Sequence, residues 1–151
     1  MLRRVDEDAL ALLVAMSYDG DGDLSRYHYS GDLAGDPASM AACTVRRIKD
    51  TGRHMELTHH AVYSGKTLIG YSTTAQEPAP MLFSFCIRKD YRTGPVLKGW
   101  LAALDALFGE DTWIVGLRDK NTRAISFFER NGFVKATHDP ENKQYFLCRS
   151  A

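Results

Sequence analysis

The 151-residue chain changes character at Gly52, and this change constrains its fold more than any other feature. Before Gly52, acids open the stretch 6–18 and apolar residues recur there at helical intervals, which predicts a first helix. A second helix is predicted over 37–50, because Pro37 suits the first turn of a helix. After Gly52, β-branched and aromatic residues and turn signals predominate, as is typical of strands.

The second half of the chain alternates strands with helices. The turn Ser64-Gly65 lies between two β-rich runs and predicts a hairpin, which apolar strands at 80–89 and 112–117 follow. An amphipathic helix is predicted from Pro95 to a stop at Gly109. A second helix over 121–132 precedes a closing hairpin around Pro140. The resulting order, ααβββαβαββ, indicates one α/β domain over 1–151, a mixed sheet with helices on its faces.

Composition excludes several classes of function. Nineteen basic and nineteen acidic residues give a net charge of zero, so nucleic acid and anionic membrane are not expected as partners. Three cysteines without a C-x-x-C pair predict a reducing compartment. No apolar run approaches the roughly 20 residues that span a bilayer. The N-terminus has acids directly after its arginines and is not expected to be a signal peptide, so we predict a cytoplasmic protein.

Two motifs resemble metal ligands at first sight. Asp19, Asp21 and Asp23 have the spacing that opens a calcium loop, but Leu24 and Ser30 stand where that loop needs a glycine and a bidentate acid. A solvated loop is therefore the favoured interpretation, and presentation of negative charge to a cationic substrate is the alternative. The pair His59-His60 lies on a predicted strand, whose neighbouring side chains point to opposite faces, so it cannot chelate one metal. We interpret the pair as strand surface and predict no metal site.

The segment NTRAISFFERNGF, residues 121–133, has a complete structural explanation. Asn121 is a good N-cap, because its side chain can accept hydrogen bonds from the free amides of the first helical turn. Gly132 can take the left-handed conformation that ends a helix, and Phe133 would then pack on Phe128. Neither aromatic residue needs a function to account for it.

Two segments together are more specific, namely 82–101 and 112–133. The first is a strand, then Tyr91-Arg92, a glycine-containing turn and an amphipathic helix. The second is a strand leading into Asn-x-x-Ala-x-x-Phe-Phe-x-x-x-Gly-Phe. This combination resembles the acyl-coenzyme A site of the GNAT superfamily of N-acetyltransferases, and the order of elements resembles the GNAT fold over nearly the whole chain. The resemblance implies a single GNAT-like domain with a mixed, mostly antiparallel sheet and helices on both faces.

In this family the start of the helix after the central strand holds the cofactor's pyrophosphate on free amides and the helix dipole. The resemblance places Arg92 at the opening of the pattern, but Pro95 and Leu97 stand at its two small positions. Pro95 removes one amide donor, and Leu97 adds bulk unless its side chain turns into the core. The amides of Gly94 and Val96 and the ammonium of Lys98 would still serve the phosphates.

The resemblance also implies a splay between the central strand and the next parallel strand, with the pantetheine arm in the gap. Backbone amides of Phe85, Cys86 and Ile87 would pair with the arm and polarise the thioester carbonyl. Asn121 would line the cofactor channel. Phe128 would lie beside the cofactor, at the position of the tyrosine that usually protonates the departing thiolate.

The family's catalytic groups are thus incomplete in this chain. Phe128 cannot donate a proton, and the strand 80–88 carries no carboxylate base. Apart from Arg88 at its end, its only polar side chains are Ser84 and Cys86. We therefore assign no catalytic residue from the sequence.

The resemblance implies an acetyl-coenzyme A-dependent N-acetyltransferase that transfers an acetyl or related acyl group to an amine on a small molecule or protein. The acidic loop and the segment SRYHYS, residues 25–30, would shape the amine site. The alternative is a catalytically inactive GNAT-like scaffold that acts as a binding or structural protein, for example in a virus.

Overall fold

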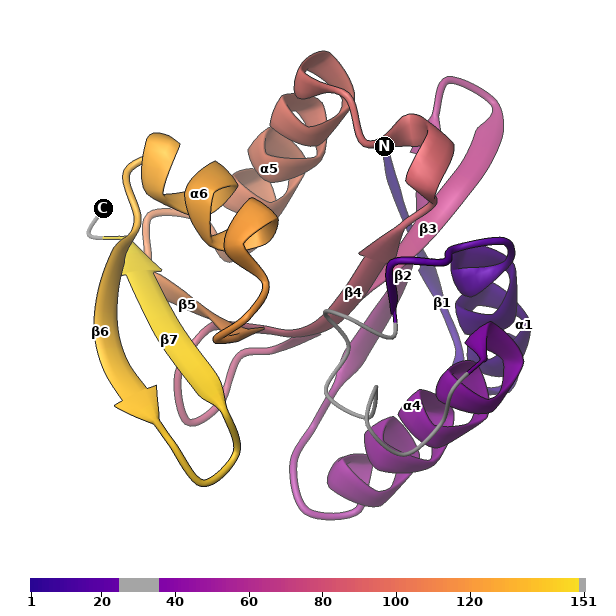
Figure 1. Ribbon diagram of the computed structural model, residues 1–151, viewed down its shortest axis with the longest axis horizontal. Helices are drawn as coiled ribbons and strands as arrows, with labels where there is room; N and C mark the ends of the chain where they lie inside the picture. Colours follow the sequence, from indigo (N-terminus) through magenta and orange to yellow (C-terminus); the bar gives the residue numbers. More distant parts are fainter. Residues whose placement is uncertain (25–35, 150–151) are drawn as a thin grey trace.

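The computed structural model describes residues 1–24 and 36–149, which form a seven-stranded sheet flanked by helices (Figure 1). The sheet order is β1-β2-β3-β4-β5-β7-β6. Among the described strands β4 and β5 are the parallel pair, and all other neighbours are antiparallel. The strands are β1 Leu2–Val5, β2 Thr58–Ser64, β3 Thr67–Ala75, β4 Met81–Ile87, β5 Trp113–Arg118, β6 Val134–Asp139 and β7 Gln144–Arg149.

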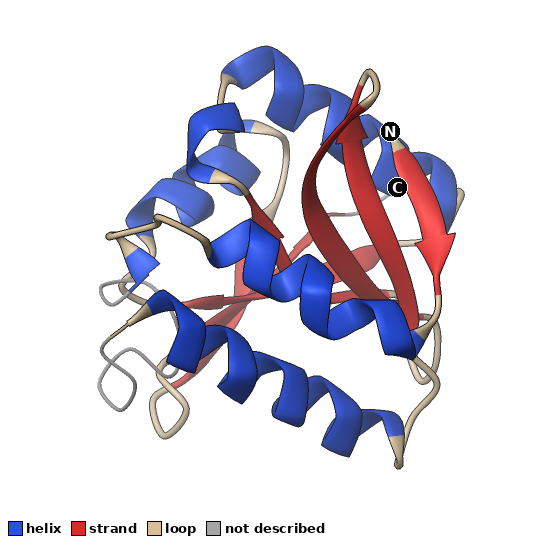
Figure 2. Cartoon of the chain, turned by 90° about the vertical axis from the view of Figure 1, so that its right-hand side faces the viewer, coloured by secondary structure: helices blue, strands red, loops and turns tan. Residues whose placement is uncertain are grey.

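Helices cover both faces of this sheet, which confirms the predicted architecture (Figure 1). On one face α1 (Glu7–Tyr18) and α4 (Pro37–Gly52) run side by side, as Figure 2 shows. On the other face lie α5 (Gly94–Phe108) and α6 (Thr122–Arg130), and a 3₁₀ turn, η1 (Lys89–Tyr91), precedes α5. Among the described residues no helix is both long and apolar enough to cross a bilayer.

A separate hydrophobic core lies on each face. The α5/α6 core is aromatic, with Trp100, Trp113 and Phe128 among its most buried side chains. The α1/α4 core contains aliphatic side chains such as Leu10 together with buried Tyr71. The sheet between the two cores therefore has chemically different surroundings on its two sides.

The end of α6 has the predicted left-handed cap. Gly132 has φ +93°, and its amide donates to Glu129 O at 3.2 Å. The amide of Phe133 donates to Phe128 O at 3.1 Å, so the two bonds form the Schellman arrangement. The rings of Phe128 and Phe133 pack edge to face with centroids 5.1 Å apart. This pairing confirms the sequence-based register of α6.

The sheet has one strand, β1, that the sequence does not predict. The segment Leu2–Val5 forms β1, which pairs with β2 at the edge of the sheet. Its two arginines and four-residue length hide the strand pattern. With β1 in place β2 is an interior strand, and both His59 and His60 are only 7% exposed. The interpretation of these histidines as strand surface is therefore wrong. Burial lowers the pKa of each imidazole, and His59 Nδ1 lies 3.0 Å from Thr73 Oγ1.

Candidate active site

A cavity opens where β4 separates from β5. Within the described residues the two strands pair only at Met81 with Ile114 and at Leu82 with Val115. Beyond Leu82 they diverge, as the resemblance implies, and leave a cavity of about 730 Å³. Its lining includes Phe85, the α5 side chain Trp100 and residues of α6. This volume lies in the range of about 300–1,000 Å³ that is typical of ligand sites.

An irregularity in β4 shapes the cavity wall. The pairing of β3 with β4 shifts between Thr73, opposite Ser84, and Thr74, opposite Leu82, so Phe83 is the extra residue. Such a bulge bends the strand and redirects side chains. After the bulge, Ser84 and Cys86 face the α1/α4 core, whereas Phe85 packs against the α5/α6 core. All four residues from Phe83 to Cys86 line the cavity.

The start of α5 lies at the cavity. Thr93 is the N-cap but makes no side-chain cap hydrogen bond, and Pro95 occupies the first turn. Leu97 packs against the α5/α6 core, as does Val96, so the bulk of Leu97 is turned inward. Gly94 and Leu97 line the cavity, whereas exposed Lys98 and partly buried Val96 lie outside its lining. Two residues of the first turn of α5 therefore contribute to the cavity wall.

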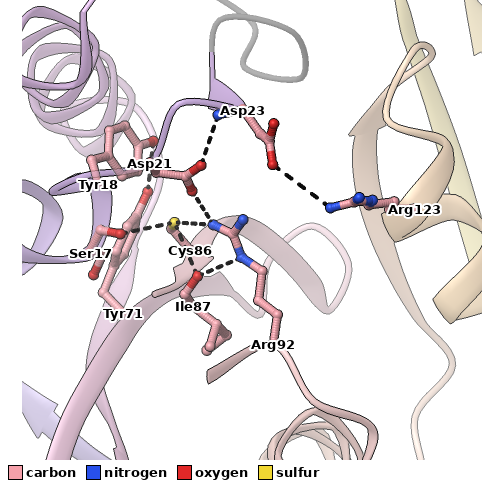
Figure 3. Close-up of polar contacts among 9 residues, drawn as sticks. All are labelled: Ser17, Tyr18, Asp21, Asp23, Tyr71, Cys86, Ile87, Arg92 and Arg123. Carbon is pink, nitrogen blue, oxygen red and sulfur yellow. Dashed lines mark hydrogen bonds and ion pairs between the residues drawn. The ribbon is translucent and has the colours of Figure 1, made fainter. Parts of the chain in front are cut away.

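Arg92 is tied to the acidic loop (Figure 3). Its Nη2 donates to Asp21 Oδ2, and its Nε donates to Ile87 O at 2.8 Å. The Asp21 side chain is fully buried, although the Arg92 side chain is 31% exposed. The interpretation of the acidic loop as solvated is therefore wrong for Asp21, because a buried carboxylate needs a cation and Arg92 supplies it. Among the described residues no cluster of three or more His, Cys, Asp or Glu side chains suits a metal ion.

A second ion pair spans the cavity mouth. Arg123 Nη1, from the first turn of α6, lies 3.8 Å from Asp23 Oδ2, and both residues line the cavity (Figure 3). The Arg123 side chain is 77% exposed, so this contact is weak. The acidic loop nevertheless lies between β4 and α6. The segment SRYHYS, predicted to help shape the amine site, lies outside the described residues.

The surroundings of Cys86 disfavour its thiolate form. It is buried on β4, and burial raises the pKa of its thiol to about 11. Its sulfur lies 3.6 Å from both Ser17 O and Arg92 Nη2. Because the thiolate is the nucleophilic form, Cys86 is not expected to act as a nucleophile near neutral pH.

On the α6 side, Asn121 caps the helix and lines the cavity. Its Oδ1 accepts a hydrogen bond from Ala124 N at 3.2 Å. Phe128 also lines the cavity, yet it is only 1% exposed. Its ring packs against Phe85 at 6.2 Å and Trp100 at 6.4 Å between centroids. Phe128 is thus both a core residue and part of the cavity wall.

Sequence reasoning missed a set of hydroxyl groups behind β4. Tyr71 Oη lies 2.8 Å from Ser84 Oγ and 3.5 Å from Tyr18 Oη. Tyr18 Oη in turn lies 3.0 Å from Thr44 Oγ1. Burial raises the pKa of the Tyr18 phenol well above its ordinary value. These four residues come from four different elements, and only Ser84 stands out in the sequence, as a polar residue on an apolar strand.

Comparison with solved structures, but not with sequences, finds proteins of the same fold. No protein-family model and no curated protein sequence matches the chain. Solved structures do match over its full length. PaiA N-acetyltransferase from Thermoplasma acidophilum in complex with coenzyme A superposes with a TM-score of 0.69 at 14% identity, covering 100% of this chain and 98% of that one. An acetyltransferase from Thermus thermophilus gives 0.70 at 18% identity, covering 100% and 96%.

A third similar structure is RimL, a ribosomal L7/L12 α-N-protein acetyltransferase in complex with coenzyme A. Its TM-score is 0.68 at 14% identity, and the match covers 99% of this chain and 92% of RimL. The chain has the GNAT fold. The predicted fold class and the sequence-based resemblance are confirmed at the level of architecture. Two of these GNAT structures contain coenzyme A.

Proposed function

We propose that the protein is an acetyl-coenzyme A-dependent N-acetyltransferase that moves an acetyl or related acyl group to an amine. The observation that carries this proposal is the splay of β4 from β5. It leaves a cavity of about 730 Å³ beside the N-terminus of α5, in a fold whose neighbours bind coenzyme A. A scaffold without a ligand has no need for such an opening.

The thioester arm would lie along β4 beyond Leu82. There Phe85, Cys86 and Ile87 pair with β3, and all three line the cavity. Backbone amides on the cavity edge would hold the arm and stabilise negative charge on the carbonyl oxygen during attack. Asn121 and the edge of Phe128 would form the opposite wall.

The pyrophosphate would bind at the start of α5. The amides of Gly94 and Val96 and the ammonium of Lys98 would contact it. Arg92 already has partners within the protein, because its guanidinium donates to Asp21 and to Ile87 O. It would bind phosphate only by exchanging Asp21 for the ligand, and otherwise it fixes the loop that presents the amides.

Catalysis would rest mostly on positioning and backbone electrostatics. A neutral amine entering from the α1/α4 side would attack the thioester carbonyl within a ternary complex. Phe128 supplies no acid, and acid–base catalysis typically contributes about 10² to 10⁴-fold. The remaining contributions, orientation of the reactants and stabilisation of charge, do not depend on the tyrosine hydroxyl that Phe128 lacks.

The partners would be a coenzyme A thioester and an amine on a small molecule or protein. We place the protein in the cytoplasm, as a single domain. The three cysteines, all in the described part of the chain, form no disulfide, which supports a reducing compartment.

The inactive scaffold remains the second candidate. It is favoured by Pro95, which removes an amide donor from the start of α5, and by the absence of a hydroxyl on Phe128. Cofactor affinity separates the two proposals.

The first experiment measures the melting temperature with acetyl-coenzyme A, coenzyme A and longer acyl thioesters. A ligand that binds only the folded state stabilises it by about 2.7 kcal/mol at a hundredfold excess over its Kd. We expect a clear rise in melting temperature and weaker binding by Lys98→Ala. Exposed Lys66, in the β2–β3 turn, provides the matched control Lys66→Ala, which should bind like the wild type. No shift at millimolar acetyl-coenzyme A would favour the scaffold.

A further inference from the structure

A chain of hydroxyl groups meets the cavity wall, which both Ser84 and Tyr18 line. Tyr71 is fully buried and Tyr18 is 3% exposed, and Thr44 lies behind them at 2%. Ser84 stands at one end of the chain, on the β4 segment that follows the bulge, and it lines the cavity. The side of β4 from which an amine would enter therefore carries a hydroxyl held by a buried partner.

The orientation of Ser84 is set from behind. Its Oγ lies 2.8 Å from Tyr71 Oη, and Tyr71 itself is held near Tyr18. A serine hydroxyl has one proton to donate and two lone pairs. If Tyr71 donates to one lone pair, Ser84 keeps its other lone pair and its proton for groups inside the cavity. A phenylalanine at 71 would pack as well but would leave the serine free to rotate.

We propose that Ser84 is a catalytic residue that accepts a proton from the attacking amine and gives its own to the departing sulfur, with Tyr71 as its positioning residue. This inference rests on the proposed acyl transfer and assigns the residue that the sequence left unassigned. A single hydroxyl then serves both of the roles for which the chain lacks the usual tyrosine and carboxylate.

The step balances without another reactant. The amine lone pair forms the C–N bond to the acyl carbon, and the C–S bond breaks with its electron pair passing to sulfur. The nitrogen loses one proton to Ser84 Oγ while the Ser84 proton passes to the sulfur. The products are an amide and a thiol, and the serine hydroxyl is restored. Because Ser84 both gains and loses a proton, it never becomes an alkoxide.

The test compares variants at three positions along the hydroxyl chain. Ser84→Ala removes the cavity end, Tyr71→Phe removes its support, and Thr44→Val removes the far hydroxyl as a matched control. Thiol release from acetyl-coenzyme A is followed with a panel of primary amines, alongside coenzyme A affinity and melting temperature. Ser84→Ala should lower kcat by roughly 10²-fold, the lower end for acid–base catalysis, with coenzyme A affinity unchanged.

The other variants sharpen the assignment. Tyr71→Phe should lower kcat less than Ser84→Ala and leave KM for acetyl-coenzyme A unchanged, whereas Thr44→Val should keep the wild-type kcat. Ser84→Thr, which retains the hydroxyl, should recover most of the activity. If Ser84→Ala does not fold, the comparison of Tyr71→Phe with Thr44→Val decides the question, since a purely structural role predicts equal kcat for both.

The outcomes separate this inference from the proposed function. Wild-type kcat in Ser84→Ala, with cofactor bound, would overturn the role of Ser84 and leave the acyltransferase intact. Absence of coenzyme A binding by the wild type would overturn the proposed function itself. If acetyl-coenzyme A binds but no amine in the panel causes release of its thiol, both catalysis and the role of Ser84 are refuted.

Discussion

The two faces of the sheet are stabilised in different ways. On the α5/α6 face, Phe128 lies in a cluster of aromatic rings that includes Trp113 and Phe133. On the α1/α4 face, the side chains behind β4 include the hydroxyls of Tyr18 and Tyr71, and the buried carboxylate of Asp21 lies beside them. One wall of the cavity is thus apolar packing, and the other is a polar network.

This difference bears on how each wall tolerates change. Apolar packing loses free energy gradually as contacts are removed. A buried ion pair responds differently, because removing one partner leaves the other charge buried without compensation. We therefore expect the largest single-residue effects on the α1/α4 side, although the motif that identifies the fold lies mostly on the other side.

The largest effect is expected for Arg92→Met. It would leave the fully buried Asp21 carboxylate without its cation, and breaking a buried ion pair from one side costs about 3 kcal/mol or more. Denaturant unfolding of the free protein measures this loss. Arg123→Met is the matched control, because its exposed pair with Asp23 should contribute about 1 kcal/mol or less. Equal stability of the two variants would show that Asp21 is solvated after all.

A smaller effect is expected for Gly132→Val on the aromatic side. Gly132 has φ +93°, and a side chain in left-handed backbone costs about 1–2 kcal/mol. Its added Cβ would also lie 3.3 Å from Arg149 Cδ. Gly52→Ala is the control, since an added Cβ there meets its neighbours at 3.9 Å, an ordinary contact. A Gly132→Val variant as stable as the wild type would mean that the end of α6 is misplaced.

The smallest effect is expected for Phe128→Tyr. The new hydroxyl would enter an aromatic cluster with 1% exposure, and a buried hydroxyl without a partner costs about 1 kcal/mol at the low end. Proximity to the cavity keeps the cost low, because water or a bound ligand can reach that wall. Thermal unfolding with and without coenzyme A tests this. A loss above about 3 kcal/mol, with unchanged cofactor affinity, would place the ring away from the cavity.

The aromatic side could be predicted largely from the sequence. Helix α6 carries its own start and stop signals in Asn121 and Gly132, and the contact of Phe128 with Phe133 follows from the Schellman geometry. The hairpins β2–β3 and β6–β7 follow from turn residues between strand-like runs. These features depend on residues close together in the chain, so local patterns determine them.

The polar wall formed by Asp21, Tyr18 and Tyr71 could be recognised only from the tertiary structure. Asp21 and Arg92 are 71 residues apart, and Tyr18 and Tyr71 are 53 apart. No local periodicity links such residues, and an acidic loop is expected to be solvated until the fold supplies its cation. The burial of His59 and His60 likewise depends on distant parts of the chain, because β1 lies beside them in the sheet and helices cover both faces of it. Helix caps and turns are local interactions that the sequence determines, whereas burial and charge pairing are long-range and require the assembled sheet.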